Sequence, residues 1–320
     1  MSKRLEKLGD SVIPAEGLSE LEQAGYRFVG EHKYSAVKIC HWTRKSLLNR
    51  GVCYKELFYG RDLGIQSHRC LQLTPGLPFC DHRCVFCWRN TDVTNPSWIG
   101  EVDEPGDILE GVIFAQRKLL SGFKGNPATN MKKWREAQEP KHCAISLAGE
   151  PTLYPKINEL IEECKRRGMT SFLVTNGMHP EVLKHIAEPT QLYISVVAPD
   201  PKTYKAVCQP QVQNGWVRLN QSLELMPSFK CRKVIRLTLV KGLNLKDAPG
   251  YAKLIEKAAP DFVEAKSYMW VGYSRKRLSM GNMPLHGEIK GFAEELARET
   301  GYSIVDESES SRVVLLKKKK

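Results

Sequence analysis

Three cysteines on one short segment carry the strongest chemical signal in the sequence. Cys80, Cys84 and Cys87 form a C-x3-C-x2-C run just after the apolar stretch 71–75. Three thiolates held close together can bind a soft metal ion or an iron–sulfur cluster. A structural zinc site usually pairs C-x2-C with a second Cys/His pair, and none follows directly here. A fourth ligand must therefore come from elsewhere.

The run resembles the cysteine motif of the radical S-adenosylmethionine (SAM) superfamily, with Phe86 directly before its last cysteine. The resemblance implies that the three thiolates bind three irons of a 4Fe-4S cluster. It also implies that the amino and carboxylate groups of SAM chelate the fourth iron. Zinc and unrelated buried thiols are the alternatives, because short spacings occur in many sequences.

Length, charge and cysteine content narrow the class of protein. The 320 residues can bury a full core, and we expect one large α/β domain with extensions. The N-terminus has no signal-peptide pattern and no segment is long and apolar enough to span a bilayer, so the ten cysteines predict a reducing cytoplasm rather than disulfides. A net charge of +12 favours a nucleic acid partner over a membrane. A merely basic surface is the alternative.

Strands and helices alternate after the cysteine run. A helix is predicted at 107–120, and the polar stretch 124–140 contains either a helix around 128–137 or an exposed insertion. A weaker pattern predicts a short helix at 19–24. Further strands are predicted at 143–147, 171–175, 192–197, 233–240 and 262–267. Helices are predicted between them at 155–167, 180–187, 216–226 and 247–257. With the strand before Cys80, this gives about six parallel βα units.

This layout matches the fold of the superfamily, a partial (β/α)6 radical SAM barrel with the cluster loop after the first strand. We expect residues 1–70 to form an N-terminal extension that carries further cysteines. Residues 71–268 would form the barrel, and residues 269–320 a C-terminal extension that contacts RNA.

Residues at the strand ends are candidates for binding SAM, because βα barrels place their sites at the carboxyl ends of strands. Gly149 and Glu150 resemble the Gly-Gly-Glu motif of the superfamily, with Ala148 in place of the first glycine. The resemblance implies that Glu150 accepts hydrogen bonds from the SAM ammonium group. Further SAM contacts are expected at Asn176, Ser195 and Arg236. An ordinary turn at Gly149 and a structural salt bridge at Arg236 are the alternatives.

A second group of cysteines precedes the run. Cys40, Cys53 and Cys70 lie among cationic and aromatic residues, which favours metal or redox chemistry over simple burial. Their spacing alone leaves both interpretations open. Together with Lys55, they resemble the archaeal tRNA 4-demethylwyosine synthase family, and the resemblance covers nearly the whole chain, including the segments 266–277 and 280–284.

That resemblance implies a concrete chemistry. The three upstream cysteines would hold a second 4Fe-4S cluster. The substrates would be pyruvate and the N1-methylguanosine beside the anticodon of tRNA-Phe. Lys55 would be the catalytic residue, forming a Schiff base with the pyruvate ketone or orienting its carboxylate. A solvated surface lysine is the alternative.

Charge clusters predict the RNA contacts. Arg275, Lys276 and Arg277 would bind phosphates, as would residues 317–320, which could equally form a disordered tail. We assign no single tryptophan to RNA stacking, because most tryptophans lie in cores. Cys143, Cys164, Cys208 and Cys231 share no spacing and are expected to be structural.

Three expectations concern the setting. Eukaryotic relatives carry a flavodoxin-like domain ahead of this unit, and the short lead-in here predicts an external electron donor such as flavodoxin or ferredoxin. We expect a monomer. Two alternative functions are kept: a radical SAM enzyme that acts on another RNA base or a protein glycyl position, and a non-catalytic zinc-stabilised RNA-binding protein.

Overall fold

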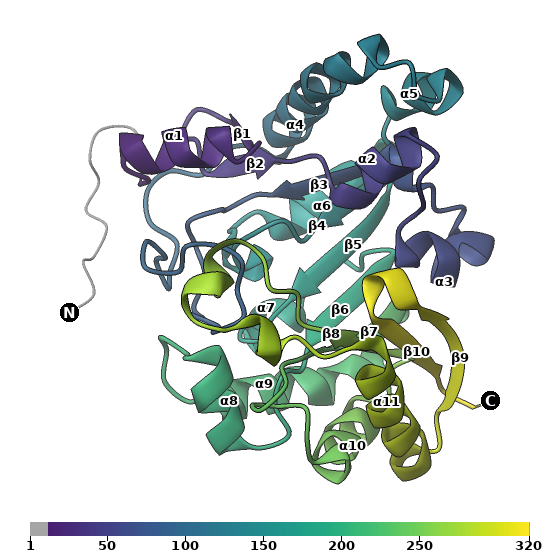
Figure 1. The fold of residues 1–320 in the computed structure, drawn as a ribbon. Coiled ribbons are helices and arrows are strands. Elements are labelled where there is room, and N and C mark those ends of the chain that lie inside the picture. Colours follow the sequence, from purple (N-terminus) through teal and green to yellow (C-terminus); the bar gives the residue numbers. More distant parts are fainter. Residues whose placement is uncertain (1–11, 320) are drawn as a thin grey trace. The chain divides into compact units, whose positions relative to one another are not determined.

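The computed structural model describes residues 12–319. Contacts between residues divide the chain into two compact units that interleave along the sequence. Unit 1 contains residues 12–80 and 97–174, and unit 2 contains residues 81–96 and 175–319 (Figure 1). The first eleven residues and Lys320, the last residue of the expected 317–320 charge cluster, lie outside the described part of the chain.

Unit 1 is built on five strands in the order β1-β2-β3-β4-β5. The pairings β1–β2 and β2–β3 are antiparallel, whereas β3, β4 and β5 run parallel. The strands are β1 (Arg27–Val29), β2 (Ser35–Val37), β3 (Cys70–Thr74), β4 (His142–Ile145) and β5 (Thr170–Thr175). The α-helices of the unit are α1 (Ala15–Gln23), α2 (His41–Leu47), α3 (Tyr54–Leu63), α4 (Pro105–Leu120), α5 (Met131–Ala137) and α6 (Ile157–Arg166).

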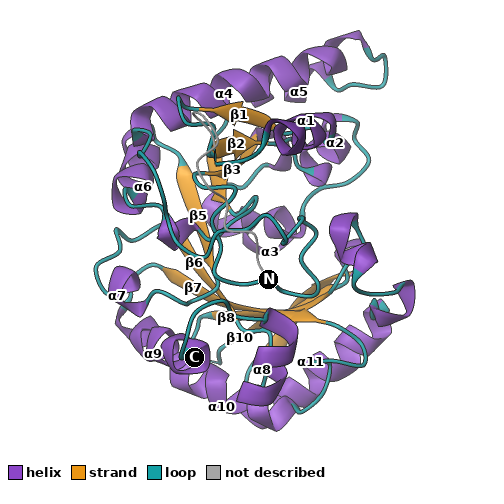
Figure 2. Ribbon diagram, turned by 90° about the vertical axis from the view of Figure 1, so that its left-hand side faces the viewer, coloured by secondary structure: helices purple, strands orange, loops and turns teal. Residues whose placement is uncertain are grey.

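Unit 2 has five strands in the order β6-β7-β8-β10-β9. The strands β6, β7 and β8 are parallel, and β10 adds antiparallel pairings to β8 and β9. The strands are β6 (Gln191–Ser195), β7 (Arg232–Leu239), β8 (Phe262–Ser267), β9 (Ser303–Ser308) and β10 (Val313–Lys317). The α-helices are α7 (Pro180–Leu183), α8 (Pro201–Cys208), α9 (Gly215–Leu225), α10 (Ala248–Ala258) and α11 (His286–Thr300). Helices α9, α10 and α11 lie side by side, and α11 packs on β8 and β10 (Figure 2).

Apolar burial holds the strands and helices in place. All four residues of β4 are buried, as expected for a strand covered on both faces. Helix α4 buries Ile108, Leu109 and Val112 completely, and each such side chain contributes about 1.5–3 kcal/mol. It begins at Pro105, earlier than predicted, because proline suits the first helical position, where no N–H is needed.

The predicted alternation of strands and helices is confirmed in both units, with ends that shift by a few residues. The polar stretch 124–140 contains α5, because the Asn130 side chain accepts hydrogen bonds from the N–H groups of Lys132 and Lys133 and so caps the helix.

The antiparallel strands at both ends of the chain escaped prediction. β2 is short and wholly buried, so it lacks the alternation that identifies a half-buried strand. β10 pairs with β8 through residues 313–317, so Lys317 lies in a strand and not in a tail. No helix in residues 12–319 combines the length and the apolar character that a membrane crossing needs.

Candidate active site

The cysteine run lies in the loop that follows β3, as predicted. Cys80 ends a segment of unit 1, while Cys84 and Cys87 belong to unit 2. All three cysteines are half-buried. The Cys87 N–H donates to the Cys84 carbonyl at 3.0 Å, which makes a tight turn between these two cysteines. Residues 80–87 are called the cluster loop below.

In unit 1, the end of β4 touches the residues just before Cys80. Gly149 has φ +72°, and a Cβ there would lie 2.2 Å from the Gly76 carbonyl oxygen and 2.8 Å from that of Phe79. The Glu150 N–H donates to the Phe79 carbonyl at 2.7 Å. Only glycine allows this approach. The small residue expected from the sequence is therefore required by the path of the chain.

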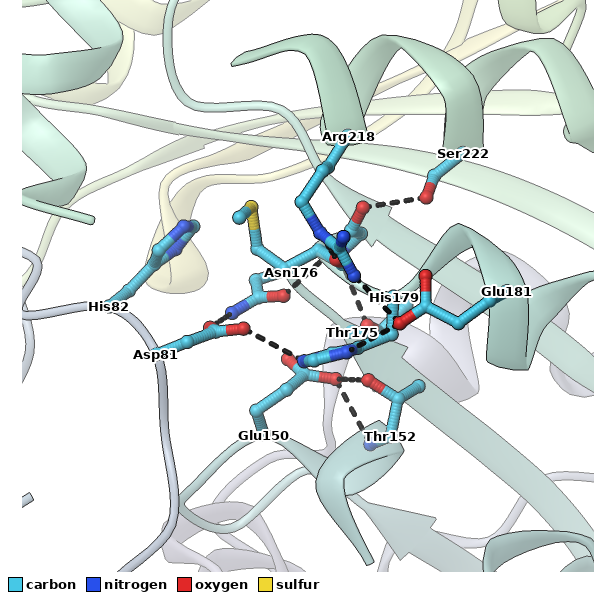
Figure 3. A network of polar contacts seen from close by, with 12 residues as sticks. Asp81, His82, Glu150, Thr152, Thr175, Asn176, His179, Glu181, Arg218 and Ser222 are labelled. Atoms are coloured by element: carbon cyan, nitrogen blue, oxygen red, sulfur yellow. Dashed lines mark hydrogen bonds and ion pairs between the residues drawn. The ribbon is translucent and has the colours of Figure 1, made fainter. Parts of the chain in front are cut away.

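The Glu150 carboxylate is buried, with 4% of the residue exposed. One of its oxygens accepts hydrogen bonds from the Thr152 N–H at 3.1 Å and from the Thr152 hydroxyl at 2.6 Å (Figure 3). These bonds fix the carboxylate at the end of β4. A buried, oriented carboxylate suits a cationic ligand group.

In unit 2, Asp81 anchors the cluster loop, a role that no sequence pattern indicates. Its side chain is fully buried and accepts hydrogen bonds from Asn176 Nδ2 at 2.5 Å and His179 Nε2 at 2.8 Å (Figure 3). Burial would raise the pKa of Asp81, but the hydrogen bond from His179, the nearby His82 and the bond from Asn176 bring that pKa below its ordinary value. The Asp81 carboxylate therefore clamps the start of the cluster loop to Asn176 and His179.

The network of polar contacts around Asp81 extends away from the cluster loop. His179 also lies 3.3 Å from Glu181, and Arg218 donates to Glu181 at 2.7 Å and to the Met178 carbonyl at 2.6 Å (Figure 3). Asn176, expected to contact SAM, here gives its amide N–H to Asp81, and its Oδ1 accepts from the Met178 N–H at 3.0 Å. Its contact in this structure is thus to the loop that carries the thiols.

The end of helix α8 holds the middle of the cluster loop. The N–H of Arg83 donates to the Cys208 carbonyl at 3.0 Å, and the N–H of Val85 donates to the Val207 carbonyl at 2.9 Å. Cys208 is buried, as expected, but its thiol also contacts Cys84. Hydrogen bonding to Cys208, together with burial, raises the pKa of the Cys84 thiol well above its ordinary value.

His82 completes this contact. The ligand atoms of His82, Cys84 and Cys208 lie within 4.8 Å of one another, and His82 Nε2 also lies 2.7 Å from the Tyr204 hydroxyl. Cys208 and His82 therefore place polar groups around the loop cysteine Cys84, a contact that the sequence did not indicate.

Arg277 holds the far end of the loop. Its guanidinium donates to the Val85 carbonyl at 3.1 Å and to the Cys87 carbonyl. The sequence predicts an RNA contact at Arg277, and that contact stays a prediction; in this structure the side chain binds the cluster loop. Arg275 and Lys276 are exposed, with their cationic groups 4.7 Å and 4.6 Å from the ring centroids of Trp270 and Tyr273.

Two predicted SAM contacts meet on neighbouring strands. Ser195 of β6 is opposite Arg236 of β7, and Arg236 is opposite Glu264 of β8. Arg236 Nε donates to the fully buried Glu264 carboxylate at 2.8 Å, and its guanidinium lies 4.4 Å from the centroid of the Tyr193 ring. The salt bridge that the sequence offered as an alternative is thus present.

In unit 1, the three upstream cysteines begin structural elements. Cys40 and Cys53 are the N-cap residues of α2 and α3, and Cys70 is the first residue of β3. Burial and the nearby Cys40 and Cys53 raise the pKa of the Cys70 thiol, while Lys55 opposes them. Cys40, Cys53 and Lys55, all distant from Cys70 in the sequence, therefore lie within electrostatic range of the Cys70 thiol.

Lys55 is half-buried in the first turn of α3. Its Nζ lies 4.9 Å from the centroid of the Phe172 ring on β5. Beside it, Glu56 accepts hydrogen bonds from the Ser67 N–H and hydroxyl, both at 2.6 Å, and Ser67 Oγ accepts from the Cys53 N–H at 2.8 Å. This arrangement ties the cysteine and the start of α3 to the segment before β3.

The donor groups fit the cofactors that the sequence suggested. Thiolates are the usual ligands of iron–sulfur clusters, and the cluster loop offers three half-buried ones. The N-cap positions of Cys40 and Cys53 suit thiolates as well, because helix N-termini stabilise negative charge. The glycine approach at Gly149 and the buried Glu150 are suited to a close-fitting ligand with a cationic group.

Comparisons with known proteins agree with these sites. Residues 74–255 match the model of the radical SAM superfamily, and residues 257–318 match a family described as wyosine base formation. The S-adenosyl-L-methionine-dependent tRNA 4-demethylwyosine synthase of Pyrococcus abyssi is 51% identical over 95% of this chain and 89% of its own length. The corresponding protein of Oryza sativa is 43% identical, but this chain covers 47% of its length.

Solved structures give the same result. A structure of TYW1 with a lysine-pyruvate adduct bound is 38% identical, with a TM-score of 0.86 over 95% of this chain and 96% of that chain. A crystal structure of archaeal TYW1 has a TM-score of 0.78 at 36% identity over the same shares. The expected fold class, a radical SAM α/β partial barrel, is thereby confirmed. The chain belongs to the radical SAM superfamily and, within it, to the S-adenosyl-L-methionine-dependent tRNA 4-demethylwyosine synthase family.

Proposed function

We propose that this protein is a radical SAM enzyme that condenses the N1-methylguanosine of tRNA-Phe with pyruvate to form 4-demethylwyosine. The observation that carries the proposal is the half-buried Lys55 beside Cys70 in unit 1, within electrostatic range of a second cysteine trio. The relative with a bound lysine-pyruvate adduct supports a lysine in this role. Family membership makes SAM and one 4Fe-4S cluster the expected cofactors.

Cys80, Cys84 and Cys87 would hold the SAM cluster, with Glu150 accepting hydrogen bonds from the SAM ammonium group. When bound, cluster and SAM supply a radical able to take hydrogen from an unreactive methyl group. The chain orients this chemistry by fixing the loop. Asp81 clamps its start, the end of α8 holds its middle, and Arg277 binds the Cys87 carbonyl.

Cys40, Cys53 and Cys70 would hold a second 4Fe-4S cluster. The support is that Cys40 and Cys53 act electrostatically on Cys70, and that the Cys53 N–H donates to Ser67 Oγ. Two N-cap thiolates gain from the partial positive charge of their helices. A cluster there would place pyruvate within reach of Lys55.

Lys55 would bind pyruvate as an imine. The neutral amine adds to the ketone carbon, two protons pass in turn from nitrogen to the former carbonyl oxygen, and that oxygen leaves as water as the C=N bond forms. Hydrolysis reverses these steps and frees the lysine. Nucleophilic amines of this kind are activated by partial burial or a cationic neighbour. The Phe172 ring, with its centroid 4.9 Å from Nζ, provides an apolar surface beside the end of the side chain.

Metal analysis tests the two-cluster proposal. Anaerobically purified protein should be brown, and changing either cysteine trio to alanine should remove about half of the iron and leave the rest. A colourless protein that contains zinc would overturn the proposal in favour of a zinc-stabilised RNA-binding protein. If the variant of Cys80, Cys84 and Cys87 lost all iron and the variant of the upstream trio lost none, the second cluster alone would be overturned.

Chemical trapping tests the role of Lys55. Incubation with pyruvate and cyanoborohydride should add one reduced pyruvyl group to the protein, and peptide mass spectrometry should find it on Lys55. Lys55→Arg keeps the charge but cannot form the imine, so it should not be labelled. Labelling of another lysine in the wild type would remove Lys55 from the mechanism.

A further inference from the structure

Unit 2 contains a cavity of about 620 Å³ along the segment that connects α8 to α9, and both helices are labelled in Figure 1. This volume lies in the range of small-molecule sites. None of the described residues that line it carries a carboxylate. They are Pro201, Tyr204, Lys205, Gln209, Pro210, Gln211, Val212, Gln213, Asn214, Gly215, Trp216 and Val217.

The polar lining consists mainly of side-chain amides. Gln209, Gln213 and Asn214 are exposed, and within the described part of the chain their amides make no hydrogen bond. An amide offers a donor and an acceptor side by side, which matches the edge of a nucleobase. Trp216 supplies a half-buried aromatic ring, and Lys205 supplies an exposed cation.

The segment that carries these amides is held in a fixed shape. Gln209 has φ +46° and Asn214 has φ +57°, both in the left-handed region. Asparagine tolerates this conformation, but glutamine at a helix C-cap stands where glycine is usual. Gly215 cannot be larger, because a Cβ there would lie 2.6 Å from the Tyr204 hydroxyl. The backbone that carries the amides therefore follows a defined path.

The same segment contacts the cluster loop. The Gln211 N–H donates to the Asp81 carbonyl at 2.8 Å, and Pro210 forms a bridge with His82. Tyr204, at the wall of the cavity, lies 2.7 Å from His82 Nε2 through its hydroxyl. All of these residues belong to unit 2. A molecule in the cavity would therefore lie next to the loop that carries Cys84 and Cys87.

We propose that this cavity binds one unpaired nucleotide of the RNA substrate, a neighbour of the base that is modified. Its base packs on Trp216, its edge bonds to Gln213 and Asn214, and Lys205 meets a phosphate. Single-stranded RNA is read through stacking and base edges in this way. The proposal rests on the proposed function for the identity of the ligand as RNA.

The lining argues against a protein electron donor as the occupant of the cavity. An acidic electron-transfer protein would be steered by several cations. Among the described lining residues, Lys205 is the only charged one. Amides beside an aromatic ring favour a nucleotide.

Binding measurements with matched variants test the proposal. The probe is a fluorescent anticodon stem-loop RNA that carries N1-methylguanosine, and its Kd is measured by anisotropy with the iron-loaded protein. The test variants are Gln213→Ala combined with Asn214→Gly, Trp216→Ala and Lys205→Ala. Glycine at 214 removes the amide but keeps the left-handed backbone. The controls are the exposed amide Gln221→Ala on α9 and the exposed Lys253→Ala on α10.

The double variant and Trp216→Ala should raise Kd about tenfold or more. Lys205→Ala should lower the slope of log Kd against log salt by about one. The controls should bind like the wild type. Should Trp216→Ala fail to fold, the double variant still decides, because both of its side chains are exposed.

Two outcomes overturn the proposal. In one, the double variant binds RNA as tightly as Gln221→Ala. In the other, it keeps its RNA affinity but accepts electrons from reduced flavodoxin more slowly, which would make the cavity a donor site. Failure of the wild type to bind the RNA would instead overturn the proposed function, so the two failures are distinguishable.

Discussion

Gly149→Ala tests the geometry of the SAM site most sharply. Alanine at φ +72° costs about 1–2 kcal/mol in backbone energy alone. Its Cβ would also lie 2.2 Å from the Gly76 carbonyl oxygen, where ordinary contact begins at 3.4 Å, so backbone must move by more than 1 Å. That movement breaks the buried bond from the Glu150 N–H to the Phe79 carbonyl, worth about 1–3 kcal/mol.

The sum is a loss of about 2–5 kcal/mol in the free energy of unfolding. Gly168→Ala is the matched control, because Gly168 has φ +65° and no atom within 4 Å of an added Cβ. It carries the backbone cost without the collision, so about 1–2 kcal/mol is expected. Urea unfolding of both variants gives the difference. The free energy of unfolding of Gly149→Ala should be about 1–3 kcal/mol lower than that of Gly168→Ala, which is the contribution of the buried hydrogen bond.

Binding of SAM gives a second measurement on the same pair. The shift moves Glu150 and the residues before Cys80, so Gly149→Ala should raise the Kd for SAM about tenfold or more, which corresponds to about 1.4 kcal/mol. Gly168→Ala should leave it unchanged. The reasoning is refuted if the two variants lose equal stability and bind SAM equally well.

Three further predictions concern single side chains. Asp81→Ala should lower the iron content after reconstitution, because the cluster loop loses its hydrogen bonds to Asn176 and His179. The control Asp92→Ala changes an exposed residue and should keep the iron. Equal iron content in both variants would exclude a role of Asp81 in holding the loop. Arg277→Lys keeps the charge but loses the paired hydrogen bonds to the carbonyls of the cluster loop, so it should also lower the iron content. The control Arg275→Lys should keep the iron. Full iron content in Arg277→Lys together with weaker RNA binding would instead indicate an RNA contact at Arg277. A hydrogen bond from Arg166 lowers the pKa of Glu163 to about 2 from 4.5. The wild type should therefore be more stable than Glu163→Gln above about pH 5, and this difference in the free energy of unfolding should fade as the pH falls toward about 2. Urea unfolding at several pH values measures the difference, and a constant difference would contradict the prediction.

The sequence was informative wherever the signal is local. The cysteine spacing and the apolar periodicity of helices such as α4 identified the cluster loop and the alternation of strands and helices, because each pattern lies within a few residues. The prediction of a close backbone approach at 148–149 was also confirmed, and Gly149 is the residue that needs it.

Contacts between distant residues could not be predicted. Arg277 binds the Val85 carbonyl across 192 positions, and Asp81 meets His179 across 98. A charge cluster at 275–277 gives no hint that one of its members turns inward. Cys208 shares no spacing with the cluster loop, so only the fold reveals its contact with Cys84.

The individual SAM and RNA contacts, the second cluster, the external electron donor, the monomeric state and the cytoplasmic setting stay predictions. A radical SAM enzyme that acts on another RNA base differs from the proposed one in needing no pyruvate. Family membership favours either enzyme over the zinc-stabilised RNA-binding protein.

Transfer of deuterium from the substrate methyl group tests the proposed radical reaction itself. Iron-loaded enzyme is given SAM, a strong reductant, pyruvate and tRNA-Phe whose N1-methylguanosine carries a deuterated methyl group. We expect deuterium in the released 5′-deoxyadenosine and a tricyclic base that forms only when pyruvate is present. Deoxyadenosine without deuterium, or the same tricyclic base without pyruvate, would contradict it.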